Sequence, residues 1–66
     1  SDLMVRAAGV LSDSEREVFI LAHEGWSVAD IAAELGLQAG AVSTRLSRAR
    51  AKVRQALGAK AVGLGE

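Results

Sequence analysis

The residues best suited to chemistry lie in one basic stretch, Gly40 to Leu57, which reads GAVSTRLSRARAKVRQAL. No acidic residue occurs between Leu35 and Gly65. A basic helix that merely faces solvent usually interleaves Glu with Lys or Arg at four-residue spacing. For a run of charge alone, a solvated face is the ordinary interpretation. The missing counter-charges instead favour a polyanionic partner. The five cations are Arg45, Arg48, Arg50, Lys52 and Arg54.

The spacing of this stretch predicts an amphipathic helix. At about 100° per residue, the apolar positions fall on one stripe. The stripe consists of Val42, Leu46, Ala49, Val53, Ala56 and Leu57. The opposite side, here called the outer row, consists of Gly40, Ser43, Thr44, Ser47, Arg48 and Ala51. Small side chains between arginines let a helix enter a DNA major groove while the arginines reach phosphates.

Within this surface the positions predict different roles. Arg48, among small residues, is the expected base reader, with Ser43, Thr44 and Ser47 beside it. Arg50 and Arg54 are expected to contact phosphate or solvent. Arg45, nearer the stripe, is expected either to contact phosphate or to pair with Glu17 or Glu34. Lys52 and Lys60 are expected to be solvated. Gly40 costs a helix interior about 1 kcal/mol relative to Ala, so close approach of another backbone or of DNA would account for it.

Composition restricts the class of protein. Sixty-six residues, half of them apolar and none of them proline, predict one small all-α bundle of three to four helices. The absence of cysteine excludes a disulfide scaffold and a zinc finger. His23 is the only histidine, so we expect no metal, no cofactor and no enzyme activity. No apolar run reaches the roughly 20 residues of a membrane span, and we expect a cytoplasmic protein.

The net charge of zero conceals a polarised chain. Residues 1–34 contain seven acids and two bases, whereas residues 35–66 contain six bases and one acid. This asymmetry indicates a polyanionic partner for the basic half. Because the chain begins at Ser1 rather than methionine, we also expect it to be a piece of a longer protein.

Helix signals divide the chain. Ser12 with Glu15, and Ser27 with Asp30, have the spacing of capping boxes. Together with glycine stops at 25 and 36, they predict helices near 13–24, 28–35 and 39–57, after a short helix at 2–9. The last two predicted helices form a helix-turn-helix. We therefore expect an N-terminal helix in residues 1–10, a helix-turn-helix domain in 11–57 and a flexible tail in 58–66.

Three apolar residues do not fit the inward faces of these helices. Phe19 and Ile20 lie beside the stripe of the 13–24 helix, so they are expected to meet the first helix or a partner protein. Trp26, between two helices, is expected to close the edge of the core.

From Leu11 to Leu57 the chain resembles region 4 of extracytoplasmic-function sigma factors. The shared positions include Arg16-Glu17-Val18, Glu24-Gly25, Leu35-Gly36 and the more specific block Arg45 to Arg50. The resemblance implies a four-helix domain whose last helix binds the promoter −35 element. It also implies docking on the β flap of RNA polymerase and sequestration by an anti-sigma factor. Carried over by position, the DNA-reading residues are Ser43, Thr44, Ser47 and Arg48, with Gly40 and Ala41 close to phosphate.

Two positions depart from that family pattern: Gln38 stands where Ser is common, and Ser43 stands where Lys or Arg is common. A second reading is therefore a sigma-like module that binds an anti-sigma factor or polymerase and contacts DNA weakly. A third is the DNA-binding domain of LuxR-type regulators, which shares the segment Ser14 to Val18.

Overall fold

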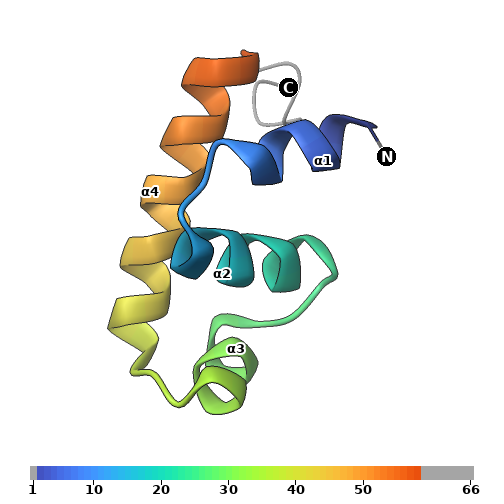
Figure 1. The fold of residues 1–66 in the computed structure, drawn as a ribbon. Coiled ribbons are helices and arrows are strands. Elements are labelled where there is room, and N and C mark those ends of the chain that lie inside the picture. The colour runs from blue at the N-terminus through green and yellow to red at the C-terminus, as the bar shows by residue number, and fades with distance from the viewer. Residues whose placement is uncertain (1, 59–66) are drawn as a thin grey trace.

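The computed structural model describes residues 2–58, which form four helices. They are α1 (Asp2–Gly9), α2 (Asp13–His23), α3 (Val28–Leu35) and α4 (Ala39–Leu57). The long helix α4 stands along one side of the molecule, and α1, α2 and α3 lie in turn along its length on the other side (Figure 1). The predicted all-α fold and helix positions are confirmed within residues 2–58. The predicted tail, apart from Gly58, lies outside them, as does Lys60.

The helix boundaries follow from local capping. The Ser12 hydroxyl accepts from the Glu15 N–H at 3.3 Å, and the Glu15 carboxylate accepts from the Ser12 N–H at 3.0 Å, which completes a capping box. At α3 only the hydroxyl half forms: Ser27 accepts from the Asp30 N–H at 3.0 Å. Gly36 ends α3 in the left-handed conformation, with φ of 68°. This conformation suits glycine and turns the chain directly into α4.

The first core cluster holds α3 against α2 and α4. Its buried members are Val18 from α2, Ile31 and Ala32 from α3, and Val42 and Leu46 from α4. Val28 and Leu35, also from α3, pack at the margin of this cluster. This cluster therefore fixes the angle at which the two helices of the helix-turn-helix meet.

The second core cluster holds α1 against the other end of α4. Ala7 and Leu11 are buried with Ala49 and Val53, and Phe19 and Leu57 pack against them. Of the two sequence-based alternatives for Phe19, contact with the α1 end of the domain is the one observed.

Ala56 is exposed, contrary to the prediction that it belongs to the buried stripe. The cluster at that end is made by Val53 and Leu57 instead.

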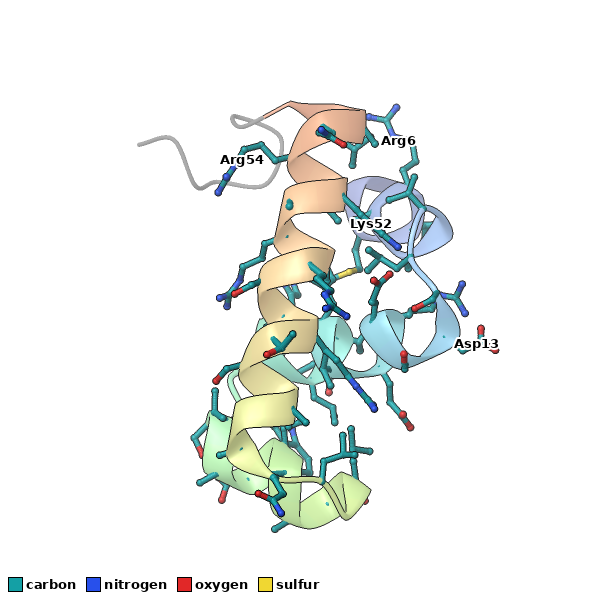
Figure 2. All side chains as sticks on the ribbon, turned by 90° about the vertical axis from the view of Figure 1, so that its left-hand side faces the viewer. Arg6, Asp13, Lys52 and Arg54 are labelled. Carbon is teal, nitrogen blue, oxygen red and sulfur yellow. The ribbon has the colours of Figure 1, made fainter. Side chains whose placement is uncertain are left out.

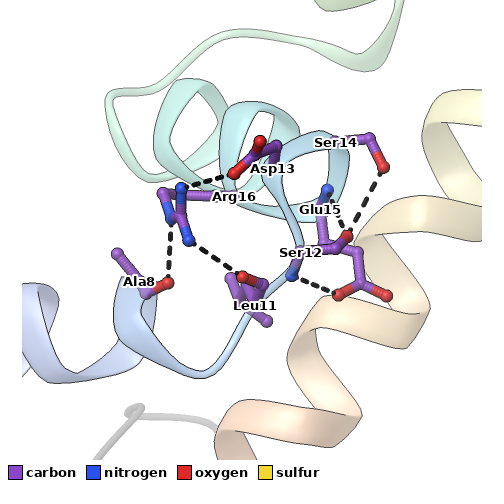
Figure 3. A network of polar contacts seen from close by, with 7 residues as sticks. All are labelled: Ala8, Leu11, Ser12, Asp13, Ser14, Glu15 and Arg16. Carbon is purple, nitrogen blue, oxygen red and sulfur yellow. Dashed lines mark hydrogen bonds and ion pairs between the residues drawn. The ribbon is translucent and has the colours of Figure 1, made fainter.

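Arg16 connects the end of α1 to the start of α2. Its Nε donates to the Ala8 carbonyl at 2.9 Å, and one terminal nitrogen donates to the Leu11 carbonyl at 3.0 Å. The other terminal nitrogen pairs with Asp13 at 3.0 Å (Figure 3). A carbonyl oxygen has two lone pairs, and the Ala8 carbonyl also accepts from the Leu11 N–H at 3.3 Å, so the planar guanidinium adds side-chain donors to the link between the two helices. Arg16 thus has a structural role.

Lys52 is exposed, as the sequence predicted, but it also forms an ion pair that the sequence did not predict. Its Nζ lies 2.8 Å from the Glu15 carboxylate, whose side chain is only 10% exposed. The pair joins the C-terminal part of α4 to the first turn of α2. Nothing in the sequence indicated this ion pair, because α4 carries no acid near Lys52. The counter-charge comes from 37 positions away in the chain.

This arrangement makes Glu15 unusually acidic. The hydrogen bond from Lys52, followed by that from the Ser12 N–H, lowers the pKa of the Glu15 carboxyl from 4.5 to about 2. A carboxylate that both a cation and a backbone donor stabilise resists protonation. Because the folded pKa is the lower one, the ionised form contributes stability above pH 4.5, and this stability is lost as the pH falls towards 2.

We therefore expect Glu15→Gln to lower stability at neutral pH and to flatten its decline between pH 4.5 and 2. Urea unfolding followed by circular dichroism at several pH values measures both effects. Glu17→Gln is the matched control, because Glu17 is an exposed acid on the same helix and forms no ion pair with a described residue. An unchanged pH profile in Glu15→Gln would contradict the assigned role.

Candidate nucleic-acid interface

One side of α4 is left bare by the packing of the other three helices. Figure 2 looks onto this side, with α1 and α2 lying to the right of and behind the helix. The exposed residues there include the whole outer row: Gly40, Ser43, Thr44, Ser47, Arg48 and Ala51. The predicted division of α4 into buried stripe and outer row is therefore observed, with Ala56 as the exception.

Three arginines project from the bare side without counter-charges. Arg48, Arg50 and Arg54 are exposed, and none forms an ion pair or hydrogen bond with another described residue. In Figure 2 Arg54 points away from the body of the molecule, whereas Lys52 turns back towards the side on which α1 and α2 lie. The unpaired cationic surface is thus narrower than the sequence suggested, because the charge of Lys52 is paired with Glu15.

Arg45 lies at the boundary between stripe and surface. It is partly buried, and it forms no ion pair with Glu17, Glu34 or any other described residue. Of its two sequence-based alternatives, the ion pair is therefore absent among residues 2–58. Its guanidinium keeps its donors available at the edge of the bare side.

The start of α4 offers backbone donors. Gln38 occupies the N-cap position and forms no side-chain cap, as its residue type predicted. The Ala41 and Val42 N–H groups donate to the Gln38 carbonyl at 3.0 and 3.1 Å. The N–H groups of Ala39 and Gly40 have no acceptor among the described residues. Free N–H groups and the helix dipole together favour an anion at such a terminus.

Gly40 is not required by packing within the domain. A Cβ built on it would meet nothing within 4 Å, and the residue lies within α4 without a positive φ. Of the two reasons considered for this glycine, approach of a neighbouring backbone in the same domain is ruled out for the described residues. Space is thus free at the point where α4 begins.

A second exposed surface lies on α2. Ile20 is half-buried and lines an open hollow of about 450 Å³ with Asp13, Ser14, Arg16 and Glu17. Phe19, its neighbour, is turned towards the second core cluster. The structure thus separates these two residues, which the sequence grouped as one candidate protein contact.

Other kinds of site are not observed in the described part of the chain. No group of three or more His, Asp and Glu side chains in residues 2–58 is placed to hold a metal ion. No helix in those residues is both long and apolar enough to cross a bilayer.

Trp26 was misplaced by sequence reasoning, since it is 38% exposed rather than closing the core. The signal that could have indicated this is its position directly after Gly25, outside both flanking helices.

Comparison with known proteins agrees with this geometry. The family model described as sigma-70, region 4 matches residues 1–53. Searches of curated proteins and of solved structures found no significant match. The matched range includes all of α1, α2 and α3 and α4 as far as Val53, and therefore most of the helix-turn-helix. On this match the chain belongs to the sigma-70 region 4 family, whose members are helix-turn-helix DNA-binding domains of transcription factors that act at promoters.

Proposed function

We propose that this domain reads the promoter −35 element for an extracytoplasmic-function sigma factor, with α4 as its recognition helix. The observation that carries the proposal is the bare side of α4, where small residues surround Arg48 and three arginines lack counter-charges. An α-helix with this surface fits the width of a major groove. Cations that are free before binding can neutralise phosphates without breaking an internal ion pair.

The residues divide into two groups by position. Arg48, central in the outer row, contacts a guanine edge, and Ser43, Thr44 and Ser47 allow the helix to approach closely enough for this contact. Arg45, Arg50 and Arg54, nearer the sides, contact phosphates. The free N–H groups at Ala39 and Gly40 hold a further phosphate at the start of α4. Phosphate contacts set the position of the helix, and base contacts set its preference for a sequence.

The extracytoplasmic-function subtype rests on the block Arg45-Leu46-Ser47-Arg48-Ala49-Arg50, the most specific part of the resemblance. With it we propose docking on the β flap of RNA polymerase, regulation by an anti-sigma factor and action in the cytoplasm. The exposed part of Ile20 and its hollow form the protein contact, and Phe19 supports it from the core side. The proposal includes no catalytic residue and no cofactor.

A second reading is favoured by one observation, the absence of a side-chain cap at Gln38. A poorly capped recognition helix loses roughly 0.5–2 kcal/mol relative to one that begins with Ser or Asp. In this reading the domain binds an anti-sigma factor or polymerase and contacts DNA weakly. The family match favours either sigma-factor reading over a LuxR-type regulator.

We expect Arg48→Ala and Arg54→Ala to have different effects on DNA binding. Loss of a bidentate guanine contact removes about 1–3 kcal/mol of discrimination, so Arg48→Ala flattens the preference for the correct duplex. Loss of one phosphate contact reduces the salt slope by about 0.9, so Arg54→Ala weakens binding to all sequences alike. Fluorescence anisotropy with a −35-like duplex and a scrambled duplex, over a salt series, measures both quantities.

One control and one refuting outcome complete this measurement. Gln55→Ala is the control, because Gln55 is another exposed residue of α4 and is uncharged. It should leave both the preference for the correct duplex and the salt slope unchanged. If the wild-type domain prefers no −35-like duplex even at low salt, yet binds a sigma partner protein, the weak-DNA reading replaces the proposed one.

We expect Gly40→Ala to separate folding from DNA binding. The added methyl meets nothing in the domain, and Ala is favoured over Gly in a helix by up to about 1 kcal/mol. Stability in urea should therefore rise or stay level, while affinity for the duplex falls because the methyl obstructs the backbone phosphate. Ala51→Gly makes the opposite substitution at an exposed position of the same helix, so it should lower stability and serves as the control for stability. Unchanged DNA affinity in a stabilised Gly40→Ala would remove Gly40 from the interface.

We expect Ile20→Asp to retain the fold and to abolish binding to polymerase core. Phe19→Ala is the comparison, because it removes packing from the second core cluster. Truncation of a fully buried Phe to Ala lowers the free energy of unfolding by about 3–5 kcal/mol. Phe19 is only half-buried, so Phe19→Ala should lower it by less. Urea unfolding and a pull-down with polymerase core distinguish the two. Unfolding of Ile20→Asp would instead make Ile20 a core residue.

A further inference from the structure

The outer face of α3 and the turn before it form a surface of opposite character to the bare side of α4. An open hollow of about 470 Å³ there is lined by Glu24, Gly25, Trp26, Asp30, Ala33 and Glu34. We call it the Trp26 hollow. No other described helix covers these residues, all of which are exposed. It is an unpartnered helix face with a large aromatic side chain at its edge.

The backbone of Trp26 is held by hydrogen bonds although the residue is exposed. Its backbone N–H donates to the Leu21 carbonyl at 3.1 Å, and the N–H of Gly25 donates to the Ala22 carbonyl at 3.0 Å. Gly25 has φ of 98°, which makes the turn compact and places Trp26 just beyond the end of α2. A backbone held by a compact turn limits where the indole can lie, and tryptophan is among the residues enriched at the hot spots of protein interfaces.

The charges around Trp26 determine what can bind. The carboxylates of Glu24, Asp30 and Glu34 form no ion pair or hydrogen bond with a described residue. No Lys or Arg occurs anywhere in the chain between Arg16 and Arg45. Three unpaired carboxylates beside an indole face offer both halves of a site for a cation: charged acceptors and a π surface.

We propose that the Trp26 hollow is a docking site for a protein segment that presents an arginine. The guanidinium stacks on Trp26 and donates to the carboxylates around it. Arginine fits better than lysine because its planar group stacks on aromatic rings and bonds carboxylates in a fork. The arginine site itself does not depend on the proposed reading of the −35 element; only the choice of a different protein over a second copy of this chain rests on that reading.

The site is placed so that DNA and this partner can bind together. In Figure 1 the turn between α2 and α3 lies on the side of the molecule away from α4. A second copy of the chain could also present arginines from its own α4. We favour a different protein, because the acidic hollow and the basic helix are different surfaces. Pairing them between copies would be head-to-tail and would use the face proposed for DNA.

The test uses the full 66-residue chain and a capped peptide with two arginines separated by glycine. Trp26 is the only tryptophan, so its fluorescence and indole N–H resonance report directly on the hollow. Two matched peptides carry lysine or glutamate in place of both arginines. With the arginine peptide we expect saturable changes in the fluorescence of Trp26 and in the amide resonances of α3. We expect weaker changes with the lysine peptide and none with the glutamate peptide. Absence of saturation, or equal responses to the arginine and glutamate peptides, would overturn the proposal.

Substitutions locate the binding. Asp30→Asn and Glu34→Gln should each weaken arginine-peptide binding roughly two- to fivefold, as expected for exposed ion pairs. Trp26→Leu, followed by the α3 amide resonances, should weaken it by a similar factor through loss of the π face. Glu17→Gln removes one exposed acid outside the hollow and should change binding less than about twofold.

Two results would refute the site. Equal weakening by Glu17→Gln and Asp30→Asn would mean that only general charge attracts the peptide. Shifts at Trp26 that grow with the concentration of the chain alone would identify the occupant as a second copy.

Discussion

The apolar stripe of α4 is the constraint on which the rest of this domain depends. Val42 and Leu46 belong to the first core cluster, and Ala49 and Val53 belong to the second. One helix therefore supplies buried residues to both clusters, and each of the other three packs against the same side of it (Figure 1). Burial of apolar surface is the main favourable term in folding. Because α4 buries apolar residues on one side only, its opposite face stays exposed and can contact another molecule.

Charge follows the same division. α4 carries no acid of its own, so its cations find counter-charges only where another helix brings one. Glu15 does this for Lys52, and the same carboxylate also completes the capping box of α2. One side chain thus starts a helix and joins it to α4. The arginines of α4 form no ion pair, because no acid among the described residues lies within reach of them.

The separation of charge also has a consequence at longer range. Acids dominate α2, the following turn and α3, whereas α4 is basic, so a chain of zero net charge carries a strong dipole. Such a field orients a molecule before contact and raises the rate of productive encounters with a polyanion. It also makes the two faces selective for partners of opposite charge. The Trp26 hollow and the bare side of α4 can therefore act as separate surfaces of one small domain.

The sequence by itself determined the features that depend on near neighbours in the chain. Helical periodicity identified α4 and its outer row, and the capping signals at Ser12 and Ser27 located the starts of α2 and α3. Only the tertiary structure decided contacts between residues that are distant in the chain. It paired Lys52 with Glu15, turned Phe19 towards Ala7 and Val53, and left Trp26 exposed. The reason is physical: periodicity specifies which side of a helix is apolar, but which residue meets it depends on how the helices pack.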